Sequence, residues 1–107
     1  METHLIHLVI WGNMVSEKFI ESKLVKAVKE RGGLAIKLAS PGFDGLPDRL
    51  VVLAKAKIGF VEVKAPGKKP TKLQRVRLRQ LKELGFLTYV LDDVKNIGGI
   101  IDEICGS

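Results

Sequence analysis

The sequence has few cysteines and histidines, the residues that form disulfides and zinc sites in small domains. It contains one cysteine, Cys105, and two histidines among 107 residues. A single cysteine excludes an internal disulfide and a zinc site built on several cysteines, so a reducing compartment is expected. Aromatic residues make up only 6% of the chain, which predicts an aliphatic core. A chain of this length has room for one domain around one such core.

Long apolar runs are also missing. The longest near the start, "LIHLVIWG" (5–12), is interrupted by His7 and lacks a basic flank. It is too short to span a bilayer, so no membrane partner is expected. Because Met14 opens a more typical start, we expect residues 1–13 to be an extension and 14–107 to be the domain. No phosphate-cradling loop or dinucleotide motif is present, which argues against a small-molecule cofactor.

Positive charge exceeds negative charge in this chain and is unevenly distributed along it. The chain carries 18 Lys and Arg against 12 Asp and Glu. The stretch 64–82 contains eight cations and no acid, which exceeds the net charge of +6 for the whole chain. Such a stretch favours a polyanionic partner, with nucleic acid first and an acidic membrane surface second. No amphipathic anchor supports a membrane surface, and the pattern predicts neither a major-groove helix nor an aromatic stacking platform.

The pattern of apolar and breaker residues predicts the order α-β-β-β-α-β-α, a mixed α/β fold with helices flanking a central sheet. Ser16 and Thr71 are suitable N-caps for the two long helices. Gly98-Gly99 is expected to break a weak last helix. The expected elements are a helix at 17–31, strands at 34–40, 48–54 and 58–65, a helix at 71–84, a strand at 86–92 and the weak helix within 93–107.

The most strand-like segment, "GFVEVKAP" (59–66), contains two charged residues. Glu62 and Lys64 point to the same face of a strand because they are two residues apart. One interpretation is a surface salt bridge, which contributes little to stability. The other requires a third group, and Asp48 begins the strand expected to form a hairpin with this one. The hairpin can bring Asp48 close to Glu62 at the end of the sheet.

Two close carboxylates repel each other unless a cation separates them. Oxygen ligands without a cysteine or histidine set suit a hard ion, Mg²⁺ or Mn²⁺. The backbone carbonyl of Val63 can add a neutral ligand. Beside such an ion, Lys64 would orient water, stabilise a phosphoryl transition state or accept a proton.

Pro47-Asp48 and Glu62-Val63-Lys64, with fourteen positions from Asp48 to Glu62, resemble the signature of the PD-(D/E)XK nucleases. The segments "GGLAIKLASPGFDGLPDRLVVL", "FVEVKAPGKKPTKLQ" and "LKELGFLTYVLD" resemble the VRR-NUC family, the virus-type replication and repair nucleases. The resemblance covers about residues 16–92. It implies a restriction-endonuclease-like fold, Mg²⁺ or Mn²⁺, and a DNA substrate. Compact members come largely from phages and bacteria, which implies the cytoplasm of a bacterial or phage-infected cell.

The resemblance also implies residue roles. Asp48 and Glu62 match the family's metal-binding acids, and Lys64 matches its catalytic lysine. An acid on the first helix is expected, for which Glu21 is preferred over Glu17. Gln74 matches a glutamine of the second helix, although "Thr71-Lys72-Leu73-Gln74" equally fits a capping box.

The basic stretch supplies candidate phosphate contacts that would carry no base sequence information. These are Lys68, Lys69, Lys72, Arg75 and Arg79. Similarity to junction resolvases favours branched DNA, such as a Holliday junction, and a homodimer. The alternative is a non-catalytic nucleic-acid-binding module of the same fold, in which Glu62 and Lys64 form a structural pair.

Overall fold

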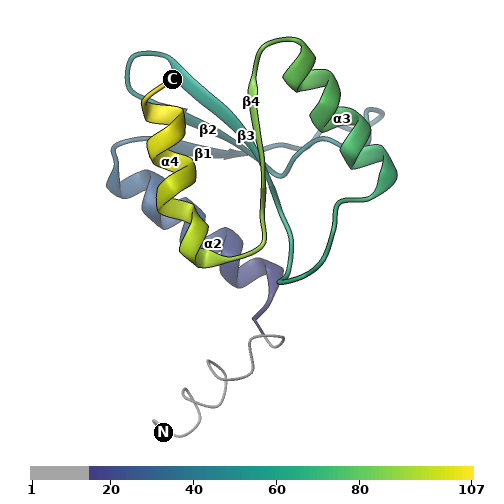
Figure 1. Ribbon diagram of the computed structural model, residues 1–107, viewed down its shortest axis with the longest axis horizontal. Helices are drawn as coiled ribbons and strands as arrows, with labels where there is room; N and C mark the ends of the chain where they lie inside the picture. The colour runs from purple at the N-terminus through teal and green to yellow at the C-terminus, as the bar shows by residue number, and fades with distance from the viewer. Residues whose placement is uncertain (1–14) are drawn as a thin grey trace, which may run out of the picture.

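The computed structural model describes residues 15–107, so the expected extension at residues 1–13 lies outside the described residues. The described chain contains three helices, four strands and one 3₁₀ turn (Figure 1). They are α2 (Glu17–Glu30), β1 (Leu34–Lys37), β2 (Arg49–Leu53), β3 (Lys57–Val63), α3 (Lys72–Glu83), β4 (Leu87–Leu91), the 3₁₀ turn η2 (Val94–Asn96) and α4 (Ile97–Cys105). The predicted element order is confirmed. Ser16 and Thr71 cap α2 and α3 through their side-chain oxygens, as their sequence positions predict.

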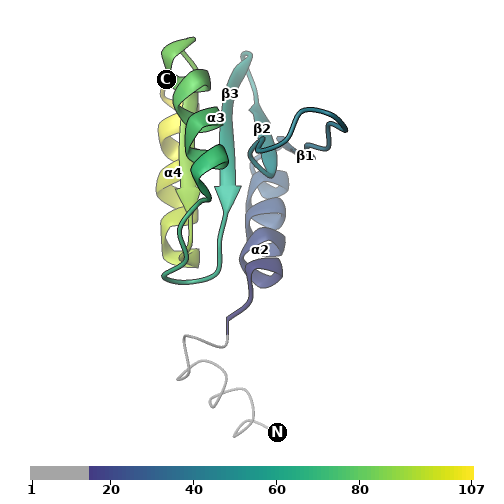
Figure 2. The same ribbon diagram turned by 90° about the vertical axis from the view of Figure 1, so that its right-hand side faces the viewer.

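The four strands form one mixed sheet in the order β1-β2-β3-β4. β1, β2 and β3 form an antiparallel meander, and β4 pairs with β3 in parallel. A parallel pair needs a crossover connection, and α3 supplies it. Because of this order, the start of β2 and the ends of β1, β3 and β4 all lie at one end of the sheet. The helix α3 packs against β4, and Figure 2 shows the β1–β2 loop standing out from the sheet.

One face of the sheet is covered by α2 and α4, which lie together on one side of the strands in Figure 1. Alternate residues of the central strands, such as Val51, Val61 and Val63, are fully buried on this face. They pack with the apolar stripes of the two helices, including Ile20, Leu24, Val28, Ile101 and Ile104. The core is aliphatic, as the composition predicts.

The other face of the sheet is covered less completely. α3 lies on this side, and none of its residues is buried. Leu34 and Ile36 of β1 remain 63% and 43% exposed, and Val90 of β4 is 43% exposed. The register pairs Leu34 with Val52 and Glu62 with Val90, so Glu62 shares this face with the exposed apolar side chains.

The prediction that Gly98-Gly99 breaks the last helix is wrong. Both glycines lie in the first turn of α4, which runs unbroken from Ile97 to Cys105. Each glycine costs about 1 kcal/mol in a helix. Four isoleucines at helical spacing (97, 100, 101 and 104) are buried against the core and outweigh that cost. Within residues 15–107, no helix is both long and apolar enough to cross a bilayer.

Candidate active site

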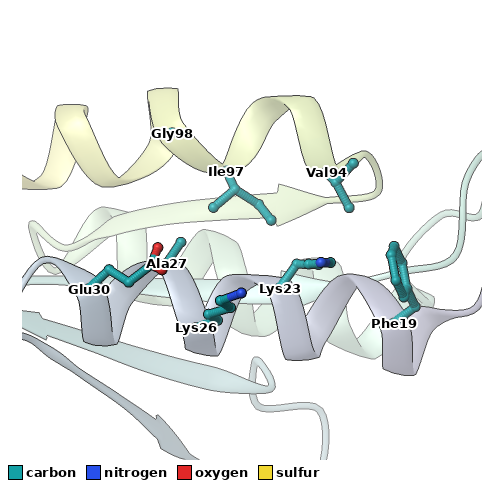
Figure 3. A pocket seen from close by; sticks show the side chains of 8 residues that line it. All are labelled: Phe19, Lys23, Lys26, Ala27, Glu30, Val94, Ile97 and Gly98. Atoms are coloured by element: carbon teal, nitrogen blue, oxygen red, sulfur yellow. The ribbon is translucent and has the colours of Figure 1, made fainter.

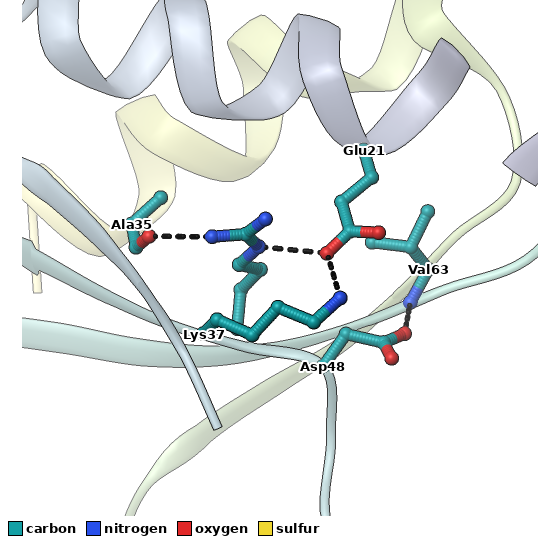
Figure 4. A network of polar contacts seen from close by, with 6 residues as sticks. Glu21, Ala35, Lys37, Asp48 and Val63 are labelled. Atoms are coloured by element: carbon teal, nitrogen blue, oxygen red, sulfur yellow. Dashed lines mark hydrogen bonds and ion pairs between the residues drawn. The ribbon is translucent and has the colours of Figure 1, made fainter. Parts of the chain in front are cut away.

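Asp48 and Glu62 meet where β2 begins and β3 ends. Arg49 pairs with Val61 in the antiparallel register, which sets Asp48 opposite Glu62 one position further on. The Val63 backbone N–H donates a 2.8 Å hydrogen bond to Asp48 Oδ2 (Figure 4). This bond fixes the orientation of the Asp48 carboxylate. The hairpin therefore brings the two acids together as the sequence predicts.

In the described part of the chain, the carboxylate of the buried Glu62 has one partner. Its side chain is 1% exposed, and Oε2 lies 3.2 Å from the Lys64 ammonium. Within residues 15–107, Oε1 has no hydrogen-bond partner. Burial is the largest cause that raises the pKa of Glu62, and the nearby Asp48 charge adds to it. Lys64 opposes both, Glu17 adds a smaller repulsion, and the pKa of Glu62 settles at about 7.

These groups fit a hard cation in part. Residues 15–107 contain no cluster of three or more His, Cys, Asp or Glu residues arranged to hold a metal. The two acids Asp48 and Glu62 are nevertheless adjacent, and a buried carboxylate oxygen without a partner carries a large free-energy cost. A bound cation would supply the missing partner. The donor set Asp48, Glu62 and the Val63 carbonyl contains only oxygen, the ligand type that Mg²⁺ and Mn²⁺ prefer.

Glu21 lies on α2 in a separate ion-pair cluster (Figure 4). Its Oε2 accepts hydrogen bonds from Lys37 Nζ at 3.1 Å and Arg49 Nε at 2.8 Å. Arg49 also donates to the Ala35 carbonyl at 3.0 Å. Burial raises the pKa of Glu21, but the hydrogen bonds and charges of Lys37 and Arg49 outweigh burial and leave this pKa below its ordinary value. Glu17, one turn earlier and exposed, is the helix acid whose charge acts on Glu62.

No family model matches the sequence. A protein of Acyrthosiphon pisum secondary endosymbiont phage 1, named "Putative nuclease p44", is 49% identical over 79 residues, which are 74% of this chain and 85% of the phage protein. A solved VRR_NUC domain shares the fold with a TM-score of 0.75 at 29% identity, over 80% of this chain and 94% of that domain. The chain belongs to the VRR-NUC nucleases. Both the expected family and the expected fold are therefore confirmed.

Gln74 of this VRR-NUC chain is the third residue of α3 and pairs with the N-cap residue Thr71. Its Oε1 accepts a 2.8 Å hydrogen bond from the Thr71 N–H, and Thr71 Oγ1 accepts a 3.1 Å bond from the Gln74 N–H. This is the capping box that the sequence allows. Within residues 15–107, the Gln74 side chain forms no hydrogen bond with Asp48, Glu62 or Lys64.

The five candidate phosphate contacts of the VRR-NUC chain are all exposed. Lys68 and Lys69 lie in the turn after β3, while Lys72, Arg75 and Arg79 lie on α3. The spacing of the three α3 residues sets them on one side of the helix. None of the five pairs with an acid anywhere in the described part of the chain. Their charges therefore remain available to a polyanion.

The two cations that pair with Glu21, Lys37 and Arg49, are not among the site residues predicted from the sequence. The register pairs Lys37 with Arg49, so both side chains lie on the face covered by α2. The alternation from Asp48 to Arg49 was the available signal, because it turns the arginine toward the helix.

An open hollow lies on the opposite side of the VRR-NUC domain from α3. Figure 3 shows Phe19, Lys23 and Lys26 of α2 facing Val94 and Ile97 across it. Its volume is about 430 Å³. None of the site residues predicted from the sequence lines it. The hollow is thus separate from the acid pair.

Proposed function

We propose that this VRR-NUC nuclease is a metal-dependent, structure-selective DNA endonuclease that hydrolyses phosphodiester bonds in branched DNA such as a Holliday junction. We assign the activity to residues 14–107 and place it in the cytoplasm of a bacterial or phage-infected cell, in keeping with the phage relative. The observation that carries the proposal is the buried Glu62 carboxylate, which lies close to Asp48 and Lys64 and has one oxygen without a partner among residues 15–107.

Each side chain of the site has a distinct task in this proposal. Asp48, Glu62 and the Val63 carbonyl would hold Mg²⁺ or Mn²⁺, which when bound polarises the scissile phosphate and activates water. Lys64 supplies positive charge where the transition state gains negative charge on the phosphoryl oxygens. Its ion pair with Glu62, at 3.2 Å, holds the ammonium in place before the substrate arrives. Glu17 and Glu21 compete for the role of an additional helix acid.

The exposed cations after β3 position the substrate. Lys68 and Lys69 follow the catalytic strand directly, and α3 continues the positive surface away from it. Such contacts bind phosphates whatever the base sequence. Selectivity for branched DNA must then come from the shape of the substrate.

Lys64→Ala tests the proposal. We expect it to lower the cleavage rate of a labelled four-way junction by about 10²-fold in Mg²⁺ or Mn²⁺, because a preorganised charge beside the scissile phosphate is lost. Wild type and variant are compared on the junction and on a linear duplex of matched sequence, each also in EDTA. Lys95→Ala, which removes a lysine 78% exposed on η2, is the matched control and should cut at the wild-type rate.

Two outcomes contradict the proposal in different ways. Binding without cutting in any metal, unaffected by Lys64→Ala, would support the non-catalytic binding module. Cutting that is equally fast on junction and duplex would keep the nuclease but remove the preference for branched DNA.

We further propose that the enzyme acts as a homodimer joined along the edge strand β1, at the opposite edge of the sheet from β4. Symmetric incision of a four-way junction needs two active sites, and this domain contains one candidate site. Leu34 and Ile36 on the edge strand β1 supply the exposed apolar surface that a second copy would bury.

Ile36→Lys is expected to weaken self-association at least tenfold, because it buries a charge at the interface. Light scattering over a dilution series should then show the monomer mass of 11.8 kDa at concentrations where the wild type has twice that mass. Leu84→Lys, at a residue 74% exposed after α3, is the control. A wild type that is monomeric at working concentration would exclude paired incision by a stable dimer.

A further inference from the structure

The loop between β1 and β2 holds an aromatic side chain and stands at the end of the sheet that carries the candidate active site. The loop is closed at its base by a 2.9 Å hydrogen bond from the Leu38 N–H to the Asp48 carbonyl. Its tip contains Phe43, Asp44 and Gly45. It therefore lies at the same end of the sheet as the acid pair, and Figure 2 shows it standing out from the strands.

The tip of this loop is fastened to α3 by Arg77. The Arg77 Nε–H donates a 2.8 Å hydrogen bond to the Asp44 carbonyl. The Arg77 guanidinium lies over the Phe43 ring, 3.9 Å from its centroid. A Cβ on Gly45 would lie 2.8 Å from Leu73 Cγ, so the loop backbone packs directly on the helix. Three independent contacts thus give the tip one position relative to α3.

This arrangement leaves the Phe43 ring presented to solvent. Phe43 remains 46% exposed although the guanidinium covers one face, and the neighbouring Leu73 is 42% exposed. The exposed cations Lys72 and Arg75 lie on the first turns of α3, on a different side of the helix from Leu73 and Arg77. Phe43 precedes Asp48 by five residues, which limits the distance between their Cα atoms to about 17 Å.

An exposed ring held rigid against a guanidinium has the features of a nucleobase contact. Unstacked bases bind to aromatic rings and to guanidinium planes. A ring already fixed by Arg77 loses little conformational freedom on binding. Paired bases in a duplex are stacked on one another and cannot use such a ring, whereas a bulge, a loop or an unpaired strand end at a branch exposes bases that can.

We propose that Phe43, backed by Arg77, is a stacking contact for an unpaired nucleobase at a branch in the DNA substrate. This inference rests on the proposed nuclease function and adds a source of selectivity for branched DNA. Arg77 acts as a positioning residue for the ring. This role distinguishes it from the phosphate-binding cations, although it lies among them in the sequence.

Binding in EDTA tests this contact without any cleavage step. The probes are a labelled DNA duplex containing one unpaired thymine and the same duplex fully paired. We expect Phe43→Leu to weaken binding of the first probe about tenfold and of the second less than twofold, while Phe43→Tyr keeps wild-type binding. The salt dependence should stay unchanged, because no phosphate contact is lost. Arg77→Ala should reproduce the loss, with no further loss in the double variant.

Phe19→Leu is the matched control, since Phe19 is also 46% exposed and lies beneath the Lys23 ammonium at 5.3 Å on α2. It should bind both probes like the wild type. The inference is overturned if Phe43→Leu binds both probes like the wild type, if it weakens both equally, or if the wild type does not distinguish them. In each case, metal-dependent cutting lost in Lys64→Ala would leave the proposed nuclease function standing.

Discussion

Glu62→Gln is expected to lower metal-dependent cleavage on the order of 10³-fold and to stabilise the metal-free protein. Loss of activity follows from the removal of a negatively charged ligand beside the scissile phosphate. The gain in stability follows from the buried state of the native carboxylate, which has Asp48 nearby and one oxygen without a partner. An amide of the same shape has no charge to desolvate.

The pH dependence of the stability gain distinguishes the loss of the Glu62 charge from an effect of the substitution that is the same at every pH. The pKa of Glu62 is about 7 in the folded protein and 4.5 as the ordinary value. The folded state therefore binds more protons between these values, and stability falls as pH rises from about 4.5 to 7. The penalty above pH 7 is at most about 3 kcal/mol. Because Gln cannot titrate, the variant should gain about 1–2 kcal/mol at pH 8 and nothing at pH 4.5.

Thermal unfolding in EDTA at both pH values measures this difference. A gain of this size corresponds to a rise in Tm of several degrees at pH 8. Glu83→Gln, on exposed α3, controls for the loss of one negative charge from a basic protein. Added Mg²⁺ or Mn²⁺ should raise the Tm of the wild type and not that of Glu62→Gln. If Glu62→Gln were less stable than the wild type at pH 8, the charged Glu62 carboxylate would not be unfavourable in the folded protein.

The centre of the site could be predicted from the sequence because it depends on local geometry. Two-residue alternation sets Glu62 beside Lys64, and a short hairpin sets Asp48 opposite Glu62. These relations involve neighbouring residues or adjacent strands, so few other folds are compatible with them. The resemblance then supplied the family, which the phage relative and the solved domain confirm.

Other features depend on tertiary packing and were not predictable in the same way. The sequence showed a glycine pair at 98–99 but not the burial that keeps α4 helical across it. It also placed Arg77 in a basic run, whereas its contacts with Phe43 and Asp44 join segments 33 residues apart. Those contacts hold the exposed Phe43 ring in place, and the sequence pattern did not indicate them.

Substitutions of the two candidate acids of α2, Glu21 and Glu17, are expected to differ in their effects on stability and on activity. Glu21→Ala should destabilise the protein by about 2–3 kcal/mol, because it leaves Arg49, only 18% exposed, without its carboxylate partner. Glu17→Ala should change stability by less than about 0.5 kcal/mol, since Glu17 is exposed. As the competing helix acid, Glu17 would add negative charge to the metal site, so this variant should instead lower the cleavage rate, by about tenfold.

Acid unfolding provides an independent check on Glu21. Its pKa in the folded protein lies below the ordinary value of 4.5, so its contribution to stability is present above that pH and is lost as pH falls through the folded pKa. The stability difference between wild type and Glu21→Ala should therefore be constant near neutral pH and shrink in acid. The reverse pattern, with Glu21→Ala stable but inactive and Glu17→Ala fully active, would make Glu21 the helix acid of the site. In the described residues both cations hold the same oxygen, Oε2, so Oε1 would be the carboxylate oxygen that Glu21 offers to the acid pair.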